Sequence, residues 1–348
     1  MFSFLLQNDT THISRREERV MQLAQCMNSI LLHSQSAVQR RLQFHLPHLI
    51  PIGHSLRMVQ YREDYSSLYE MYDEHCTKMA LAKDLPYLHN LKRLQDVQAR
   101  GPAQMVNLRQ EIFTEITQMI PSTVAADFLM RRLASHGEWW AVRSHLTSQL
   151  ALTGVLTHIL GIGCRLPSQM LIAPQKGELW LQEAVPILNQ ASPTLQANEP
   201  VPFRFTPALQ GIVTKRGMSG LFATSIVSSS RALAEPLSFF LPLFMRDEYL
   251  FWMTFNKTLQ HADRPAGHSR PSPKLDPTVN PLKDSHAGIQ KLVDEVAKRL
   301  ETLSCRPVPE KSPKATKPPL DQPVTQLISS ATNPLKLSQM DYLLMPWL

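Results

Sequence analysis

The sequence predicts an α+β fold in which a small mixed lobe is followed by a larger helical lobe. Two observations support this prediction. One helical stripe and two short β-type segments share the first sixty residues, whereas residues 105–160 and 200–259 are mostly helical with proline breaks. With 348 residues, 43% of them hydrophobic, the chain can bury a substantial core.

A helix with one buried face is predicted to start near Arg15. Its apolar residues recur at helical spacing: Val20, Leu23, Ala24, Met27, Ile30 and Leu31. We place Glu17 and Glu18 in its first turn, where acidic side chains favour the helix N-terminus. The next segment, LIPIGHSLRMVQ at residues 49–60, has β-compatible residues on both sides of Gly53-His54 and predicts two short strands.

The middle of the chain is predicted to be mostly helical. One apolar stripe ends before Pro121 and consists of Met105, Leu108, Ile112, Ile116 and Met119. A second helix is predicted from about Trp139 to Leu160. A turn, GIGCRLPSQML at residues 161–171, follows it, and GELWLQEAVP from Gly177 alternates like a strand. The tryptophans are predicted to be packing anchors: Trp139, Trp140, Trp252 and Trp347.

The C-terminal third is predicted to contain two linkers. Residues 263–283 and 306–323 are rich in proline and charge. Between them, Asp284 or Ser285 is expected to cap a helix at about 285–303, which must dock on some other surface through one apolar stripe: Ile289, Leu292, Val293, Val296, Leu300 and Leu303. A last stripe comprises Val324, Leu327, Ile328 and Ala331, and the apolar end LLMPWL is expected to pack against the larger lobe.

Charge and cysteine usage favour a soluble intracellular protein. Part of the net charge of +7 lies in the linkers, which contain no aromatic residue for base stacking, so no direct nucleic-acid binding is expected. Four separated cysteines form no disulfide framework, and no apolar run reaches the roughly 20 residues of a membrane span. His45 and His48 are separated by Pro47 and have no accompanying cysteine or carboxylate pair, so no metal site is predicted there.

Four segments, in this order, resemble the phosphatidylinositol 3-kinase-related protein kinases. They are SRREERVMQL from Ser14, GIGCRLPSQML from Gly161, EPVPFRFTPALQ from Glu199 and the ending MPWL. The residues in these motifs are most similar to those of the pseudokinase branch of that family. The resemblance implies a two-lobed, protein-kinase-like fold with an incomplete small lobe (1–60), a larger helical lobe (61–262), linkers (263–319) and a C-terminal FATC helical module (320–348).

The resemblance also implies which positions would bind a nucleotide. Phosphoryl transfer requires a lysine on the phosphates and carboxylate or amide groups that hold Mg²⁺. The segment FSFLLQN places Gln7 at the lysine position, and a register shifted by two residues places Asp9 there. Glu183 falls at the position of the metal-binding aspartate, and Met58 lies near that of the adenine-stacking tryptophan. No cofactor or metal site is therefore expected.

The turn at residues 161–171 departs from the catalytic loop of the active kinases. Cys164 stands in place of the aspartate, Leu166 in place of histidine and Gln169 in place of asparagine, and Arg165 alone is retained. Cys164 could in principle be a nucleophile if a neighbouring cation lowered its pKa. We favour the simpler interpretation that it fills the space of the missing aspartate.

The resemblance implies a catalytically inactive scaffold rather than an enzyme. Such a scaffold would be a nuclear adaptor that contacts subunits of histone acetyltransferase complexes and transcription activators. The basic linkers and the helix from Ile289 to Leu303 are the surfaces we expect to matter. The alternative is an active serine/threonine kinase with an atypical site that uses Glu183 for the metal.

Overall fold

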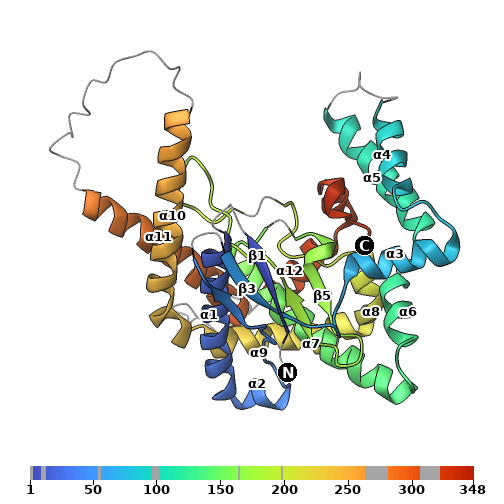
Figure 1. The fold of residues 1–348 in the computed structure, drawn as a ribbon, viewed down its shortest axis with the longest axis horizontal. Coiled ribbons are helices and arrows are strands. Elements are labelled where there is room, and N and C mark those ends of the chain that lie inside the picture. Colours follow the sequence, from blue (N-terminus) through green and yellow to red (C-terminus); the bar gives the residue numbers. More distant parts are fainter. Residues whose placement is uncertain are drawn as a thin grey trace, which may run out of the picture.

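The computed structural model describes residues 3–8, 13–53, 56–95, 102–163, 165–196, 199–262, 281–305 and 322–348. These segments form two small antiparallel sheets and a larger group of helices (Figure 1). The predicted α+β class is confirmed. Asp9 and Cys164 lie outside the described residues, as do residues 263–280 and 306–321 of the predicted linkers.

The first sheet has the strand order β1-β3-β2. It consists of β1 (Ser3–Asn8), β2 (Leu49–Pro51) and β3 (Leu56–Tyr61), which confirms the strands predicted around Gly53. Gln7 lies opposite Arg57 in the β1–β3 register. The predicted first helix is α1 (Ile13–Leu32), followed by the short α2 (Gln35–Gln39). Because α1 begins at Ile13, Glu17 lies in its second turn rather than its first.

A second sheet, of order β4-β5-β6, lies beside α7. It contains β4 (Ser66–Ser67), β5 (Met170–Ile172) and β6 (Leu179–Leu181). β5 occupies the end of the segment predicted as a turn, and the strand predicted from Gly177 is only three residues long. In the chain, β4 leads directly into α3 (Leu68–Met79). A capping box of Ser67 and Glu70 closes the first turn of α3.

The helical lobe is organised around α7 (His136–Leu160), which is almost wholly buried from Leu146 onward. Its end at Gly161 has a φ of +62°, a conformation that glycine adopts without steric cost. α4 (Leu85–Gln95) and α5 (Pro102–Met119) project from the body as a pair, and α6 (Val124–Met130) connects them to α7 (Figure 1). The helices predicted from residues 105 and 139 are thus confirmed.

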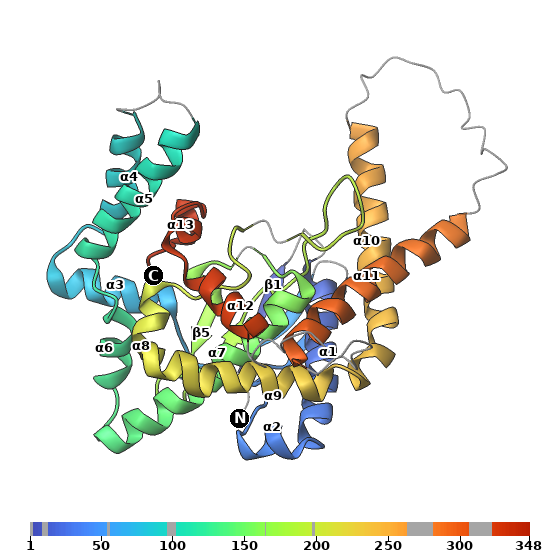
Figure 2. The same ribbon diagram turned by 180° about the vertical axis from the view of Figure 1, so that it is seen from behind.

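Four further helical elements follow the second sheet. They are α8 (Pro207–Gly217), a π-helical turn (Met218–Phe222), α9 (Ala223–Leu233) and α10 (Leu241–Ala262), with the 3-10 turn η3 (Pro236–Phe239) before α10. Figure 2 shows α9 lying across the side of the molecule opposite the view of Figure 1. In the described residues, no helix combines the length and apolarity required to cross a bilayer.

The helix predicted at about 285–303 is α11 (Pro281–Ser304), so it begins earlier than expected. Pro281 occupies the first helical position, where its fixed φ favours helix initiation, and Asp284 and Ser285 are therefore helical residues rather than caps. The predicted apolar stripe is buried, except for a half-buried Ile289, and α11 packs on α9, α10 and α7. The apolar stripe of this helix is thus buried within the chain.

The C-terminal segment packs on the larger lobe, as predicted. It contains α12 (Gln322–Thr332), α13 (Pro334–Leu337) and the 3-10 turn η4 (Tyr342–Leu344). Trp347 and Leu348 are buried, with exposed fractions of 3% and 0%. The prediction for Trp140 is wrong, because it lies on the outer side of α7 and is 70% exposed, whereas its neighbour Trp139 packs against the core.

Candidate functional site

A buried ion pair forms between Arg57 of β3 and Glu17 of α1. Three of the predicted site positions, Gln7, Gln169 and Glu183, lie around it. Arg57 Nε donates to Gln7 Oε1 over 3.0 Å, and Arg57 Nη1 donates to Glu17 Oε2 over 2.5 Å. Arg57 is 7% exposed and Glu17 is 3% exposed. The residue at the predicted lysine position therefore accepts a hydrogen bond from an internal cation.

Glu17 also connects α1 to the loop after β6. Its second oxygen, Oε1, accepts a hydrogen bond from the backbone N–H of Glu183 at 2.6 Å. Glu183 Oε1 lies 3.9 Å from Arg57 Nη2, and Glu183 Oε2 accepts from Gln169 Nε2 at 2.6 Å. The structure thus brings Gln7, Gln169 and Glu183 together around the Arg57–Glu17 pair, which the motif comparison had not included.

Glu183 has an unfavourable backbone conformation for a residue with a side chain. Its φ is +52°, in the left-handed region that costs about 1–2 kcal/mol for a non-glycine residue. Its side chain is 44% exposed, so its carboxylate reaches solvent while its N–H is engaged by Glu17. The interactions of this loop hold the strained residue at the meeting point of the two lobes.

Burial dominates the electrostatics of Glu17. It raises the pKa of the carboxyl above its usual value, whereas the Arg57 guanidinium and the Glu183 N–H act in the opposite direction. A buried carboxylate without these two donors would be strongly destabilised. In this buried ion pair, the charge of Arg57 and the charge of Glu17 therefore compensate each other.

Arg165 belongs to a different cluster, deeper in the larger lobe. It is 1% exposed, and its Nε and Nη2 donate to the two oxygens of Glu199 at 3.1 and 2.5 Å. Arg204 donates to the carbonyl of Arg165 and to three carbonyls of the C-terminal segment, those of Leu344, Met345 and Leu348. Burial lowers the pKa of Arg204 to about 9. The single retained residue of the catalytic loop thus has a structural role.

Two other predicted positions, Leu166 and Met58, have apolar side chains without a titratable group. Leu166 is half-buried and precedes the 3-10 turn η1 (Pro167–Gln169). Met58 lies on the face of β3 opposite Arg57, in register with Leu6 and Ile50. Within the part of the chain that the structure describes, no group of three histidine, cysteine or acidic side chains could hold a metal ion.

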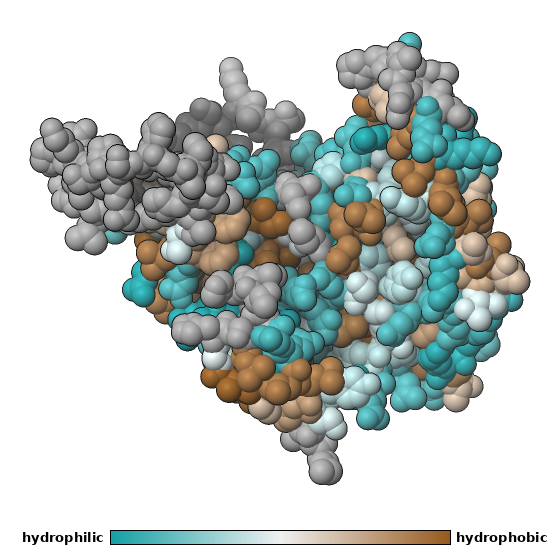
Figure 3. All heavy atoms as spheres, turned by 45° about the horizontal axis from the view of Figure 1, so that its top comes forward, coloured by the Kyte–Doolittle hydropathy of each residue, from teal (hydrophilic) through white to brown (hydrophobic). Residues whose placement is uncertain are grey.

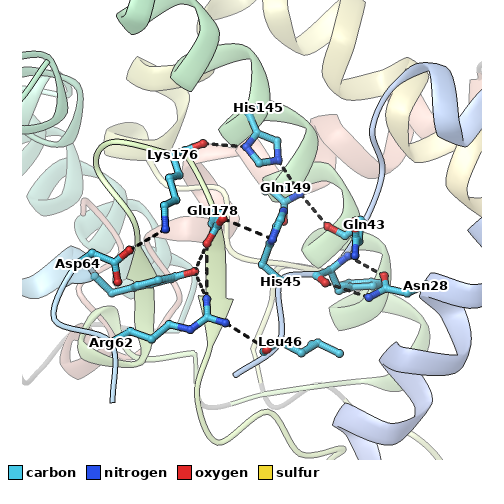
Figure 4. A network of polar contacts seen from close by, with 12 residues as sticks. Asn28, Gln43, His45, Leu46, Arg62, Asp64, His145, Gln149, Lys176 and Glu178 are labelled. Carbon is cyan, nitrogen blue, oxygen red and sulfur yellow. Dashed lines mark hydrogen bonds and ion pairs between the residues drawn. The ribbon is translucent and has the colours of Figure 1, made fainter. Parts of the chain in front are cut away.

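A second polar network lies where the segment after β3 meets α7 and the β5–β6 connection (Figure 4). Glu178 accepts from Tyr65 at 2.5 Å and faces the Nδ1 of His45 at 3.6 Å. Burial lowers the pKa of His45, while Glu178 opposes that shift. His145 lies edge-on to His45 with ring centroids 5.3 Å apart. This network holds the chain crossing between the two lobes against α7.

Two residues of this site, Glu17 and Arg57, were not predicted from the sequence, although the position of each on a buried face could have indicated it. Glu17 lies three residues before Val20 and seven before Ala24, which places a carboxylate on the buried face of α1. Arg57 shares a strand face with the buried Val59. A charged residue on a buried face requires a partner, but residue spacing does not show which residue that partner is.

A family model described as phosphatidylinositol 3- and 4-kinase matches residues 2–252, which include both sheets and the Arg57–Glu17 site. The chain belongs to the phosphatidylinositol 3- and 4-kinase family. The resemblance inferred from the four motifs is thereby confirmed.

Relatives in this family extend the match to the whole chain. The chain is 28% identical over 353 residues to the transformation/transcription domain-associated protein of Homo sapiens, with 100% of this chain and 9% of the relative covered. It is 26% identical over 365 residues to the SAGA complex/NuA4 acetyltransferase complex subunit Tra1 of Schizosaccharomyces pombe, with 99% and 9% covered. The chain therefore spans about a tenth of the length of these relatives.

A solved structure supports the fold of this family member. The FAT and kinase domain of CtTel1 aligns with a TM-score of 0.67 and 18% identity, covering 100% of this chain and 22% of that one. At this identity the likeness establishes the kinase-like fold alone. A kinase-like domain of the phosphatidylinositol 3- and 4-kinase family is therefore present.

Proposed function

We propose that this chain is a catalytically inactive, kinase-like adaptor of histone acetyltransferase coactivator complexes. The observation that carries the proposal is the saturation of Arg57. Its donors are directed to Gln7 and Glu17, and its remaining edge faces Glu183. A triphosphate would have to displace the buried Glu17 carboxylate to reach this cation, which is unfavourable.

The residue types at the predicted positions support inactivity. Kinases depend on positioned charges around the phosphates and Mg²⁺, but Gln7, Leu166 and Gln169 are uncharged, as is Cys164 in its thiol form. Loss of one general acid or base reduces a rate by about 10²- to 10⁴-fold. Loss of the phosphate cation and the metal ligands as well removes the electrostatic stabilisation that dominates such reactions.

The adaptor role is supported by the names of the relatives. Tra1 of Schizosaccharomyces pombe is named as a subunit of the SAGA and NuA4 acetyltransferase complexes. We infer for this chain an equivalent role in transcription and chromatin, in the nucleus, with acetyltransferase subunits and transcription activators as partners. The basic segments at 263–283 and 306–323 are among the surfaces that we propose for these contacts.

We also propose the division of the chain into a small lobe (1–60), a large lobe (61–262), a linker region (263–319) and a FATC module (320–348). The grouping of β1, β2 and β3 in one sheet supports the first boundary. The dense polar contacts of Arg204 with the C-terminal carbonyls support the close association of the last module with the large lobe.

Nucleotide binding tests the proposed inactivity directly. The melting temperature of the purified chain is measured with and without Mg-ATP, with an active family kinase as positive control. We expect no shift, whereas a ligand present at 100 times its Kd stabilises the native state by about 2.7 kcal/mol. A clear upward shift, together with phosphoryl transfer from radiolabelled ATP that disappears in Glu183→Ala, would establish the atypical kinase instead.

The adaptor role is tested by affinity purification from nuclear extract. The tag belongs at the N-terminus, because Trp347 and Leu348 are buried. We expect acetyltransferase-complex subunits to co-purify with the chain at moderate salt, as identified by mass spectrometry. Recovery of the folded chain without any such subunit contradicts the proposed partners but leaves the inactivity of the site unaffected.

A further inference from the structure

α10 has an exposed apolar stripe on the side that faces away from the core. Phe239, at the end of η3, is 82% exposed, Leu243 is 58% exposed and Leu250 is 47% exposed. Leu243 and Leu250 are seven residues apart and share one face of α10, with Arg246 between them, and Phe239 lies just before the helix. We call these four residues the outer stripe. The inner face of α10, which includes Phe244, Met245 and Tyr249, is already buried.

Two hollows extend this surface along the seam between α10 and α1. The larger, of about 1050 Å³, is lined on the α10 side by Leu250, Phe251 and Phe255 and on the α1 side by Arg15, Arg16, Glu18, Arg19 and Gln22. The smaller, of about 480 Å³, lies between the end of α1 and the segment that precedes α10, where Ala232, Pro236 and Phe240 line it. α10 stands at the edge of the molecule beside α1 (Figure 1).

The seam carries an excess of exposed positive charge. Arg19 is 45% exposed and Arg246 is 59% exposed, and both share the single carboxylate of Asp247, at 2.9 and 3.7 Å. Arg15 is also exposed, whereas Glu18 is half-buried. A third ion pair, Arg16 with Glu248, is internal, since Glu248 is 1% exposed.

Single exposed hydrophobic residues are normal on protein surfaces. Figure 3 shows hydrophobic side chains gathered in separate patches on one face of the molecule rather than mixed evenly with polar ones. The outer stripe differs from isolated residues because it has helical spacing, adjoining hollows and a basic border. An apolar surface with a charged rim is typical of a site that receives another protein segment.

We propose that the outer stripe and the adjoining α1–α10 seam bind an amphipathic helix of a partner protein that carries acidic residues beside its apolar face. The apolar side chains of the partner would pack on Phe239, Leu243 and Leu250, and its carboxylates would face Arg19 and Arg246. The residues that follow α10 in this chain do not fit this description, since Arg264, Arg270 and Lys274 have the same sign as the seam.

This inference rests on the proposed adaptor role, because an adaptor requires a surface for its partners. The two can fail separately. Co-purification from nuclear extract reports on the adaptor role as a whole, whereas binding of a defined peptide reports on the seam alone.

The test uses a fluorescein-labelled, 20-residue helical peptide with leucines at positions i, i+3, i+4 and i+7 and glutamates beside them. Its binding to the whole chain is followed by fluorescence anisotropy, with a second peptide in which every glutamate is lysine. We expect Leu243→Asp to weaken binding about tenfold or more. Arg246→Glu should weaken binding and reduce its dependence on salt.

The matched control is Leu88→Asp, because Leu88 is a similarly exposed leucine (57%) on α4, a different part of the surface. This variant should bind like the wild type, and circular dichroism melts should show that all variants fold. Equal binding of the glutamate and lysine peptides would overturn the proposal, as would equal losses in Leu243→Asp and Leu88→Asp. Sedimentation showing a wild-type dimer that Leu243→Asp dissociates would assign the seam to a second copy and likewise overturn it.

Discussion

Arg57 Nη1 lies 2.5 Å from Glu17 Oε2, and both side chains are almost inaccessible to solvent. This pair joins β3 to α1, and through the Glu183 N–H it also joins the small lobe to the loop after β6. In a catalytic site these groups would have to exchange partners with a nucleotide. Here Arg57, Glu17 and the Glu183 N–H connect the two lobes. Measuring the stability of variants at this pair therefore tests its structural role.

Removing one member of the pair should be strongly destabilising. We expect Arg57→Ala to lower the free energy of unfolding by about 3–5 kcal/mol, because it leaves the Glu17 carboxylate buried without its cation. The measurement is urea denaturation followed by circular dichroism. Lys176→Ala is the matched control, since its ion pair with Asp64 is exposed by 59% and 49% and such pairs contribute about 0–1 kcal/mol. Similar losses in both variants would contradict the interlobe role.

The backbone of Glu183 can be tested by comparing two truncations at the same position. Glu183→Gly and Glu183→Ala both remove the contact with Gln169, but only glycine adopts the φ of +52° without strain. We expect the glycine variant to be more stable than the alanine variant by about 1 kcal/mol. A more stable alanine variant, measured by the same denaturation curves, would show that the loop relaxes rather than holding strain.

Stability should fall with acidification through His158 at the end of α7. Burial, followed by the nearby Arg299 and Arg165 guanidinium groups, lowers the pKa of this histidine to about 4. The unfolded chain therefore binds the proton more readily, so the contribution is complete above about pH 6.5 and is lost progressively toward pH 4. Urea midpoints across this range should decrease in the wild type and decrease less in His158→Gln.

The comparison between wild type and His158→Gln is needed because two other buried groups, the carboxyls of Glu17 and Glu248, change the stability in the opposite direction as the pH falls. Burial raises the pKa of Glu17 and of Glu248, so protonation of either group as the pH falls favours the folded state. These contributions are common to both proteins and cancel in the difference. Identical slopes for the two proteins would exclude His158 as a source of acid sensitivity.

The C-terminal tryptophan should contribute far more to stability than the exposed one on α7. Trp347→Ala is expected to lower the free energy of unfolding by about 3–5 kcal/mol, because it removes a fully packed aromatic side chain. Trp140→Ala, at a position that is 70% exposed, should change it by no more than about 0.5 kcal/mol. Thermal melts of the two variants measure the difference, and a comparable loss in both would contradict the described packing.

The fold could largely be predicted from periodicity, because the apolar stripes are long. The stripes on α1 and α11 identified their buried residues, and Gly53 marked the turn between two strands. β4 and β5 could not be predicted, since strands of two and three residues contain too little alternation. Residue spacing likewise could not show that α11 would use its stripe within the chain rather than for a partner.

The candidate site was predicted only in part, for a different physical reason. Gln7, Gln169 and Glu183 were selected by correspondence to a motif, which marks positions but not the new contacts made when the original residues change. Arg57 and Glu17 are separated by forty residues, and nothing local in the sequence indicates that they meet. Their burial on two facing elements becomes evident only when the elements are assembled.

The attachment of the C-terminal residues to Arg204 has a consequence for biosynthesis. Arg204 and Thr206 donate to the carbonyl of Leu348, and Arg204 also donates to the carbonyls of Leu344 and Met345. Until residues 344–348 have emerged from the ribosome, the guanidinium of Arg204 lacks these acceptors, and the larger lobe cannot complete its native packing. Chains shortened by a premature stop codon are thus expected to expose this defect to cellular quality control.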